Sequence, residues 1–250
     1  MSGKLGGKIS IVTGGLSGIG AAVAARMVAE GAIVIAADLA TDASTLGDGN
    51  LLPFRADVAD AASVSALVNA VIARYGRVDC LVNSAGIGKD IPFLDTPLEI
   101  FDKIIAVNLR GSFIIGQAAA QAMRQTGGGV IVNIASVSGM TGNVGRSAYG
   151  ASKGGVVLLS RVMAVDLAQF NIRVNVLAPG PVETPLVAQL HSPEIRQRWI
   201  EQTPLRRYAS PDEMAGVVVF LCSDDASYIT GHVLAADGGF LASGLTTEMA

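Results

Sequence analysis

Tyr149 and Lys153 lie four residues apart, and Ser136 lies thirteen residues before the tyrosine, just after an apolar run. Residues i and i+4 share one face of a helix, so the phenol and the ammonium would point the same way. A phenol titrates near pH 10, but a nearby positive charge favours the phenolate. Lowering its pKa by about three units requires roughly 4 kcal/mol. The three residues could therefore take a proton from a substrate oxygen held by Ser136, although an ordinary surface pair on a helix has the same spacing.

A glycine-rich segment, residues 13–20, reads Thr-Gly-Gly-Leu-Ser-Gly-Ile-Gly. The apolar run before it, 9–12, is typical of a buried strand, and the alanine-rich stretch after it predicts a helix over 21–30 that ends at Gly31. A strand, a glycine turn and a helix N-terminus together offer backbone N–H groups to a diphosphate. The spacing is G-x-x-x-G-x-G rather than the commoner G-x-G-x-x-G, and a flexible turn is the alternative. The order of these elements favours a dinucleotide site.

Asp38 follows the next apolar run, 33–37, and bears on which nucleotide fits. A carboxylate at the end of the second strand accepts hydrogen bonds from ribose hydroxyls and would repel a 2′-phosphate. Its neighbours Ala37 and Leu39 are not basic, and Ser17 stands in the turn where an arginine could pair with that phosphate. A solvated carboxylate at a strand end is the alternative. The sequence therefore favours NAD over NADP.

Apolar strand candidates alternate with helical segments along the chain. Strands are expected at 9–13, 32–37, 51–55, 79–83, 129–134, 172–177 and 232–236. Helices are expected between them, for example at 63–75, 98–125, 147–170 and 211–223. This alternation predicts an α/β fold, a doubly wound parallel sheet of the Rossmann type with seven strands and helices on both faces. Unbroken apolar strands agree with burial on both sides of such a sheet.

The chain of 250 residues is expected to form one domain, 1–250, because neither a linker nor a repeat interrupts it. The longest loop expected within it is the segment at about 182–210, with one or two short helices. Loops of that length are usually functional lids or disordered, so we interpret this segment as a substrate lid. Trp199 within it is either an oligomer contact or a packing anchor.

Composition excludes several classes of partner. Half of the residues are apolar, 16% are charged and the net charge is −3, which does not indicate a nucleic-acid or membrane-surface partner. Residues 1–8 lack the apolar core of a signal peptide, and apolar stretches of membrane-spanning length are missing. Cys80 and Cys222 are expected to be isolated, buried, free thiols, which suits a reducing cytoplasm. His191 and His232 lack partners at ligand spacing, so no metal site is predicted.

Through these residues, the chain from about Lys8 to Phe240 resembles the short-chain dehydrogenase/reductase family in its single-domain form. The segment 13–20 resembles the family's cofactor loop. The segments that resemble the family's other motifs are Asp57-Val58 at the adenine, Asn83-Ser84-Ala85-Gly86 after the fourth strand, residues 179–184 at the nicotinamide and Asp237-Gly238-Gly239 near the C-terminus. Ser84 is a mild departure from the family's second asparagine.

The resemblance implies a catalytic tetrad and a cofactor site. The tetrad would be Asn108, Ser136, Tyr149 and Lys153. The residues implied at the cofactor are Gly14, Ser17, Gly18, Ile19, Gly20, Asp38, Asp57, Val58, Asn83, Ala85, Gly86, Tyr149, Lys153, Pro179, Gly180, Val182 and Thr184. Asn108 would kink its helix so that a freed carbonyl binds a water that relays protons from Lys153; alternatively, it satisfies a local backbone group.

The resemblance also implies an NAD-dependent oxidoreductase that interconverts a secondary alcohol and a ketone, and a homotetramer. Within the family, the sequence favours a sugar, a polyol or another small hydroxy compound. A β-ketoacyl-acyl-carrier-protein reductase is the alternative; Asp38 opposes it, as do the missing basic residues at 127–129 and 170–171. A nucleotide-sensing regulator without catalysis is a third possibility, but such proteins typically lose the tyrosine or the lysine.

Several polar residues near these motifs leave the substrate open. Lys89 or Arg146 could meet an acidic group, or could be solvated. Ser138 is a possible second substrate contact, whereas Ser152 is expected to pack or cap. The lid region also holds four arginines, which could form a basic patch for a carrier protein or a solvated face with intersubunit pairs; they are Arg196, Arg198, Arg206 and Arg207.

Overall fold

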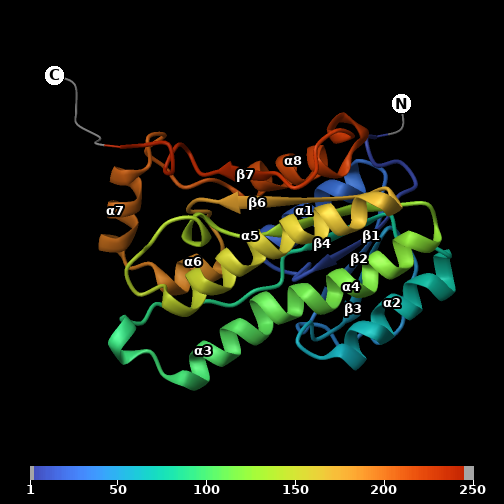
Figure 1. The fold of residues 1–250 in the computed structure, drawn as a ribbon, viewed down its shortest axis with the longest axis horizontal. Helices are drawn as coiled ribbons and strands as arrows, with labels where there is room; N and C mark the ends of the chain where they lie inside the picture. The colour runs from blue at the N-terminus through green and yellow to red at the C-terminus, as the bar shows by residue number, and fades with distance from the viewer. Residues whose placement is uncertain (1–2, 245–250) are drawn as a thin grey trace.

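Seven short apolar strands form one parallel sheet in the computed structural model, which describes residues 3–244 (Figure 1). The strands are β1 (Ile9–Thr13), β2 (Ile33–Asp38), β3 (Leu51–Arg55), β4 (Cys80–Asn83), β5 (Gly129–Ile134), β6 (Ile172–Pro179) and β7 (Val233–Ala236). Their spatial order is β3-β2-β1-β4-β5-β6-β7, and every neighbouring pair is parallel. The predicted seven-stranded doubly wound sheet is confirmed.

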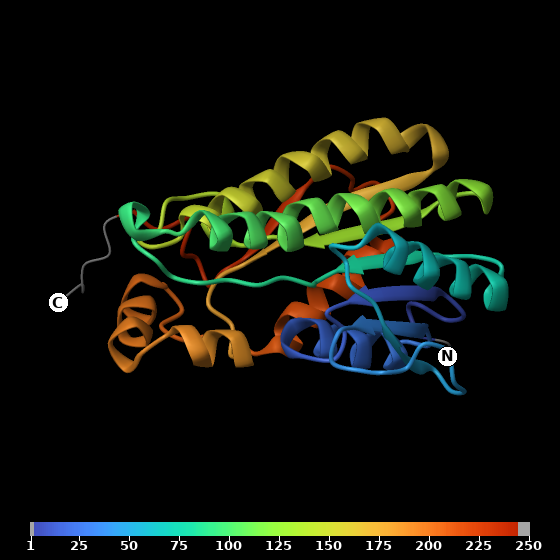
Figure 2. The ribbon, with the colours of Figure 1, turned by 90° about the horizontal axis from the view of Figure 1, so that it is seen from below.

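Helices cover both faces of this sheet, so the molecule has three layers (Figure 2). One face carries α2 (Ala61–Tyr75), α4 (Gly111–Gln125) and α5 (Ser147–Leu167), and the other carries α1 (Gly18–Ala29) and α8 (Pro211–Cys222). Each interface has its own apolar core: Leu67, Ile115 and Ile131 are fully buried in the first, and Met27, Val34 and Val218 in the second. Both faces of the central strands are thus removed from water, as their unbroken apolar sequences require.

The helix expected over 98–125 is interrupted. It consists of α3 (Leu98–Ile105), a π-helical turn (Ala106–Arg110) and α4.

The lid segment holds two short helices, α6 (Pro185–Leu190) and α7 (Pro193–Gln202). Each begins with a proline after a capping hydroxyl, Thr184 or Ser192, because proline at the first helical position lacks only an N–H that would be unpaired there. Single 3₁₀ turns complete the helices, at Phe93–Asp95, Val137–Gly139, Ala168–Phe170 and Asp224–Ala226.

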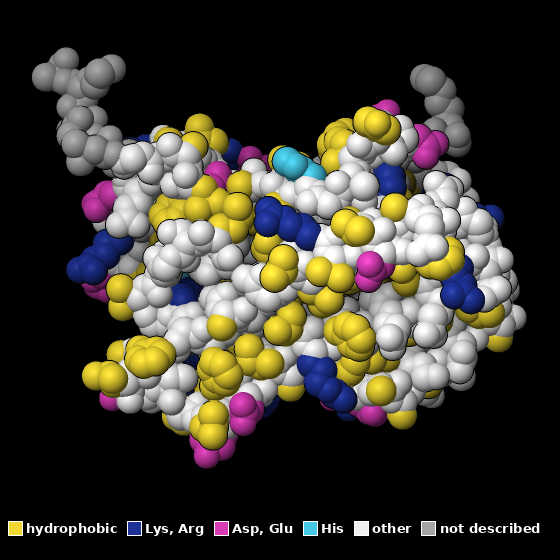
Figure 3. Space-filling view, in the orientation of Figure 1, with side chains coloured by type: hydrophobic (Ala, Val, Ile, Leu, Met, Phe, Trp, Pro, Cys, Tyr) yellow, Lys and Arg dark blue, Asp and Glu magenta, His cyan; other side chains and the backbone are white. Residues whose placement is uncertain are grey.

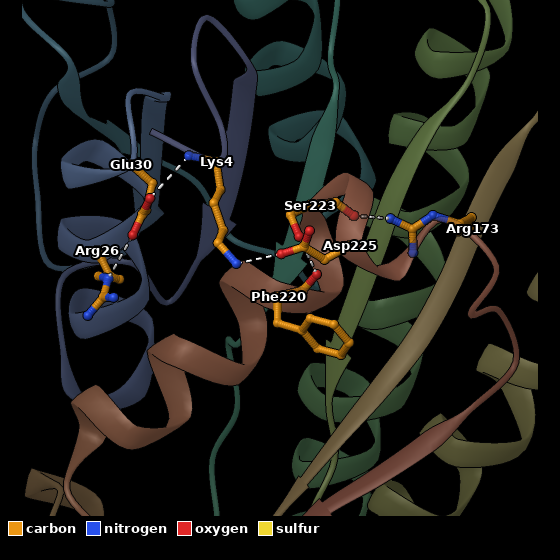
Figure 4. Close-up of polar contacts among 7 residues, drawn as sticks. All are labelled: Lys4, Arg26, Glu30, Arg173, Phe220, Ser223 and Asp225. Carbon is orange, nitrogen blue, oxygen red and sulfur yellow. Dashed lines mark hydrogen bonds and ion pairs between the residues drawn. The ribbon is translucent and has the colours of Figure 1, made fainter. Parts of the chain in front are cut away.

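At the end of the sheet where the strands begin, polar contacts join the segment before β1, the end of α1, the start of β6 and the segment after α8 (Figure 4). The backbone N–H of Lys4 donates to Glu30 at the end of α1, and the Lys4 ammonium pairs with Asp225 after α8. On β6, the Arg173 guanidinium donates to the carbonyl of Ser223, also after α8. The opposite end, where the strands finish, is left to loops and to the lid helices.

Cys80 and Cys222 are free and buried, as predicted, but they are not isolated. Both lie in the apolar cluster between the sheet and α8, Cys80 at the start of β4 and Cys222 at the end of α8. Within residues 3–244, no helix combines the length and the apolar character needed to cross a bilayer. The same residues contain no group of three or more His, Cys, Asp or Glu side chains placed to hold a metal ion.

Candidate active site

A cleft opens at the carboxyl ends of the strands, where the strand order reverses between β1 and β4. Such a reversal leaves a crevice because the connections on its two sides run in opposite directions. The predicted site residues that line the cleft are Gly14, Ser17, Gly18, Ile19, Ala85, Gly86, Ser136, Tyr149, Lys153, Pro179, Gly180, Val182 and Thr184. The fold therefore brings together residues that lie as much as 170 positions apart.

The glycine turn after β1 has a backbone conformation in which an added Cβ atom would clash with neighbouring backbone. Gly14 has φ +64°, and a Cβ there would lie 3.0 Å from the backbone of Ala85. A Cβ on Gly20 would lie 2.1 Å from the Gly14 carbonyl oxygen. No side chain of the described residues caps α1 at Ser17, so the first-turn N–H groups remain available at the cleft. This cradle fits the diphosphate of a dinucleotide.

Thr13 ties this turn to the segment after β4. Its hydroxyl donates to Asn83 Oδ1 (2.8 Å) and accepts from the backbone N–H of Ala85 (3.1 Å). Asn83 is buried, so its side chain braces the two sides of the cleft instead of facing into it.

Asp38 lies at the end of β2 and accepts hydrogen bonds from the backbone N–H groups of Leu16 (3.2 Å) and Ala40 (3.0 Å). Sequence neighbours suggested that no basic residue is near. In the structure, however, Arg55 on β3 is paired in register with Asp38, and its guanidinium donates to the carbonyl of Leu39 (2.8 Å). This residue was missed because the pairing of β2 with β3 brings it there across seventeen positions of sequence.

Asp57 and Val58 lie on the β3–α2 loop, outside the lining of the cleft. Asp57 Oδ1 accepts from the N–H of Ala59 (2.8 Å), and Val58 is buried against Gly111. Both residues thus shape the loop at the adenine end expected from the resemblance.

Tyr149 and Lys153 share one face of α5, as predicted from their spacing. The Lys153 ammonium lies 5.8 Å from the centre of the Tyr149 ring and donates to the carbonyl of Ile134 (2.8 Å) at the end of β5. Ser136 follows β5 directly, lines the same cleft and accepts from the N–H of Ser138 (3.1 Å). A phenol, an ammonium and a hydroxyl are therefore gathered at one wall of the cleft.

Burial shifts the pKa values of both the phenol and the ammonium at this wall. Burial raises the pKa of Tyr149, while the charge of Arg146 and a hydrogen bond with Ser136 oppose that rise. Burial also lowers the pKa of Lys153 to about 8. The chain alone thus does not lower the pKa of the phenol, because removal of the phenol from water outweighs the charges around it.

Asn108 is fully buried in the π turn, and its side chain is completely engaged. It donates to the carbonyl of Ile87 (2.9 Å) and to the hydroxyl of Ser152 (3.0 Å), and it accepts from the N–H of Ile87 (2.9 Å). Its own carbonyl accepts from the Ser112 hydroxyl (2.6 Å). The expected disturbance of the helix is thus present as a π turn, but the carbonyl is not wholly free. The side chain thus satisfies a local backbone group, as one alternative for Asn108 predicted, and the proton relay stays a prediction.

The lid brings a buried histidine to the catalytic helix. His191 contacts Arg146 through Nε2 (3.1 Å) and Tyr208 through Nδ1 (2.8 Å). Trp199 stacks on His191 and packs against Phe240, with ring centres 6.0 Å and 4.9 Å apart, so it is a packing anchor within this chain. Arg146 also pairs with Asp90 (2.8 Å). Sequence reasoning missed this cluster because its members come from three separate segments.

Three of the four lid arginines are engaged within the chain. Arg196 pairs with Glu183, and its guanidinium lies 4.4 Å from the Tyr208 ring centre. Arg207 forms a two-point pair with Glu213 at 2.8 and 2.7 Å. Arg206 donates to the carbonyl of Glu201 (2.7 Å). These contacts weaken the interpretation of the arginines as a basic patch.

Comparison with known proteins points to enzymes of alcohol and ketone chemistry. A family model described as enoyl-(acyl carrier protein) reductase matches residues 14–241. The 3-oxoacyl-[acyl-carrier-protein] reductase of Thermotoga maritima is 40% identical over 245 residues, covering 95% of this chain and 99% of the relative. The D-threitol dehydrogenase of Mycolicibacterium smegmatis is 41% identical over 244 residues, covering 95% and 94%.

A solved structure extends this similarity to three dimensions. A 7α-hydroxysteroid dehydrogenase complexed with NADH and 7-oxo glycochenodeoxycholic acid superposes with a TM-score of 0.88 at 36% identity, covering 94% of each chain. Relatives with one fold thus act on substrates as different as a four-carbon polyol, a steroid and a carrier-bound acyl chain.

Proposed function

Because the chain belongs to the short-chain dehydrogenase/reductase family, we propose that it interconverts a secondary alcohol and a ketone with NAD. The observation that carries this proposal is that Ser136, Tyr149 and Lys153 line the same cleft as the glycine turn. A hydride carrier bound at the turn and an alcohol at the tyrosine would therefore be adjacent. The bound nicotinamide would supply the hydride acceptor.

The chain's own residues would handle the proton. In the oxidative direction, Tyr149 as phenolate takes the hydroxyl proton of the substrate, whose oxygen is held by Ser136. The carbon loses a hydride, so the products are a ketone, reduced cofactor and one proton. Lys153 favours the phenolate by its charge and passes the proton outward near Asn108. The segment 182–210 closes over the substrate, since Leu186 and Val187 of α6 already line the cleft.

We assign the cofactor as NAD on the strength of Asp38, whose carboxylate lies beside the glycine turn. We assign the substrate to sugars, polyols or other small hydroxy compounds. The alternative, a β-ketoacyl-acyl-carrier-protein reductase, needs a basic surface for an acidic partner. Arg196 and Arg207 are instead paired with Glu183 and Glu213.

The proposal is tested by NADH formation with panels of polyols, sugars, hydroxy acids and steroid alcohols, run beside acetoacetyl-carrier protein with NADH and NADPH. We expect the best kcat/KM for a small hydroxy compound with NAD. A carrier-linked substrate that wins by more than tenfold would reject the substrate class. A lack of turnover with every panel would reject the enzymatic function itself.

We also propose a homotetramer. The outer faces of α4 and α5 expose several large apolar side chains that gather in Figure 3, with exposed fractions of 49% for Phe113, 63% for Leu158, 50% for Val162 and 79% for Val165. An exposed apolar patch of this kind marks an interface. Light scattering at micromolar concentration should give four times the chain mass of 25.5 kDa, and a monomer mass would contradict the proposal.

A further inference from the structure

Two cations, rather than one, approach the Tyr149 ring. The Arg146 guanidinium carbon lies 5.2 Å from the ring centre, and the Lys153 ammonium lies 5.8 Å from it. The Arg146 side chain is only 11% exposed, so water screens its charge weakly. We propose that Arg146 is a second cation for the reaction and that it stabilises the phenolate form of Tyr149 while Asp90 and His191 hold it in place. This inference rests on the role proposed above for Tyr149.

The backbone fixes the acid beside the arginine. The N–H of Ile91 donates to the carbonyl of Gly145 (2.9 Å), and Ile91 pairs with Arg146 in a parallel bridge. Asp90 is therefore docked against the start of α5, where its carboxylate reaches Arg146 Nε at 2.8 Å. The adjacent Lys89 is exposed.

His191 holds the other side of the guanidinium and must be neutral to do so. A guanidinium only donates, so His191 Nε2 accepts from Arg146, and the ring proton sits on Nδ1 facing Tyr208. Burial and the charges of Arg146 and Arg196 lower the pKa of His191 to about 4, while Glu183 acts in the opposite sense. The imidazole therefore stays an acceptor throughout the neutral range.

The charges around Tyr149 act with opposite signs. Burial raises the pKa of the phenol, Arg146 and Ser136 lower it, and Asp90 raises it. Lys153 faces the ring from the next turn of α5, and Gly88 lies beside the edge of the ring. Arg146 and Asp90 thus form an ion pair whose two members shift the pKa of Tyr149 in opposite directions.

This opposition permits a test with matched variants. Arg146→Gln should raise the pH at which Tyr149 ionises by about one unit, because an opposite charge at this distance lowers an acid's pKa by about one unit or more. Asp90→Asn should lower that pH, and Arg146→Lys should restore most of the wild-type value. Arg161→Gln changes an exposed arginine of the same helix and should have no effect.

The readout is the ¹³C resonance of the tyrosine ring carbon that bears oxygen, titrated in the NAD complex of selectively labelled protein. Tyr149→Phe assigns the signal among four tyrosines. The pH profile of kcat/KM with the best alcohol should move by the same amounts. Since the resonance does not depend on turnover, it can support the inference even if no alcohol is oxidised.

Three outcomes would overturn the inference: equal titrations in wild type and Arg146→Gln, shifts of the same sign in Arg146→Gln and Asp90→Asn, or failure of Arg146→Lys to restore the value. A variant that raises KM only for acidic substrates and leaves the titration unchanged would show that Arg146 binds a substrate anion instead.

Discussion

The two halves of the cleft are built by different means. On the nucleotide half, formed by the glycine turn, the end of β2 and residues 83–86, the shape comes from backbone: a carbonyl at Gly14, free N–H groups at α1 and a threonine brace. On the half that we propose for the substrate, lined by Ser136, Tyr149 and the lid residues Leu186 and Val187, the wall is supported by long side chains that meet across the fold, as Arg146 meets His191. The first half leaves little freedom of sequence, and the second can be exchanged without changing the fold. Relatives that are 36–41% identical to this chain yet carry the names of enzymes with different substrates agree with this division.

The largest effect should follow from one atom on the substrate half. Tyr149→Phe removes the proton acceptor, and positioned acid–base groups contribute about 10²–10⁴-fold, so turnover should fall by at least the lower figure. NAD binding, measured by fluorescence titration, should survive because the glycine turn and the end of β2 are unchanged. Tyr228→Phe is the control, since Tyr228 is fully exposed. A Tyr149→Phe enzyme with a tenth of wild-type kcat would refute the assignment.

On the nucleotide half, one added carbon should lower both the stability of the fold and the affinity for NAD. Gly20→Ala places a Cβ 2.1 Å from the Gly14 carbonyl oxygen, which forces the turn to move. We expect a loss of about 1–3 kcal/mol in unfolding free energy, typical of overpacking, together with weakened NAD binding. Gly47→Ala is the control, because a Cβ there meets no atom of the described residues within 4 Å. Unchanged stability and affinity in Gly20→Ala would show that the turn is less constrained than its geometry indicates.

Asp38 is the exception on the nucleotide half, because there a side chain rather than the backbone is expected to select NAD over NADP. We expect kcat/KM to favour NAD over NADP by more than about tenfold, or roughly 1.4 kcal/mol. Asp38→Ala should narrow that ratio, and adding Arg55→Gln should restore part of it, because the double variant also lacks the guanidinium that would attract a 2′-phosphate. Asp42→Ala is the control, since Asp42 is fully exposed and also near Arg55. Equal efficiency of wild type with both cofactors would defeat the assignment.

Lys153 lies between the two halves. Its replacement should have a smaller effect, and it should raise the free energy of unfolding rather than lower it. Its pKa is lowered from 10.5 to about 8, so burying its charge costs about 3 kcal/mol below pH 8. Between pH 8 and 10.5 the unfolded chain holds a proton that the folded chain has lost, and stability should therefore rise with pH across that window. Lys153→Met removes this cost but also the hydrogen bond to Ile134. We expect a net gain of about 1–2 kcal/mol.

Urea unfolding at several pH values measures this gain, with Lys103→Met as a control on a lysine outside the cleft. A destabilised Lys153→Met chain, or a wild-type stability that is flat from pH 8 to 10.5, would show that the ammonium is well solvated.

The division of the cleft also explains what the sequence could predict. Strands β1 to β7 were predicted within two residues because each is rich in apolar residues and the segments between them are helical or polar. The glycine turn was predicted because its backbone demands glycine at fixed spacing. The contact of Arg146 with His191 was not, since it spans 45 positions and depends on how the lid packs. The proximity of Arg55 to Asp38 needed the strand order, which the sequence of β3 alone does not contain.

The division of 98–125 into two helices had a weaker signal. An asparagine within an apolar stretch indicated a disturbance, and the structure has a π turn there. The raised pKa of the phenol in the chain alone had no signal in the sequence, because burial cannot be read from a four-residue spacing.

The π turn at Ala106–Arg110 has a consequence for how this chain can change length. A π turn holds one residue more than an α turn, so it advances everything after it by about 100° around the helix axis. Ile115, Ala119 and Met123 face the core only with that extra residue in place. Deleting any one residue of the turn would let a regular helix form, yet it would turn these three side chains toward solvent or withdraw Asn108 from Ile87. The loop at 126–128, eighteen positions after Asn108, should accept an inserted residue far more readily than the turn can lose one.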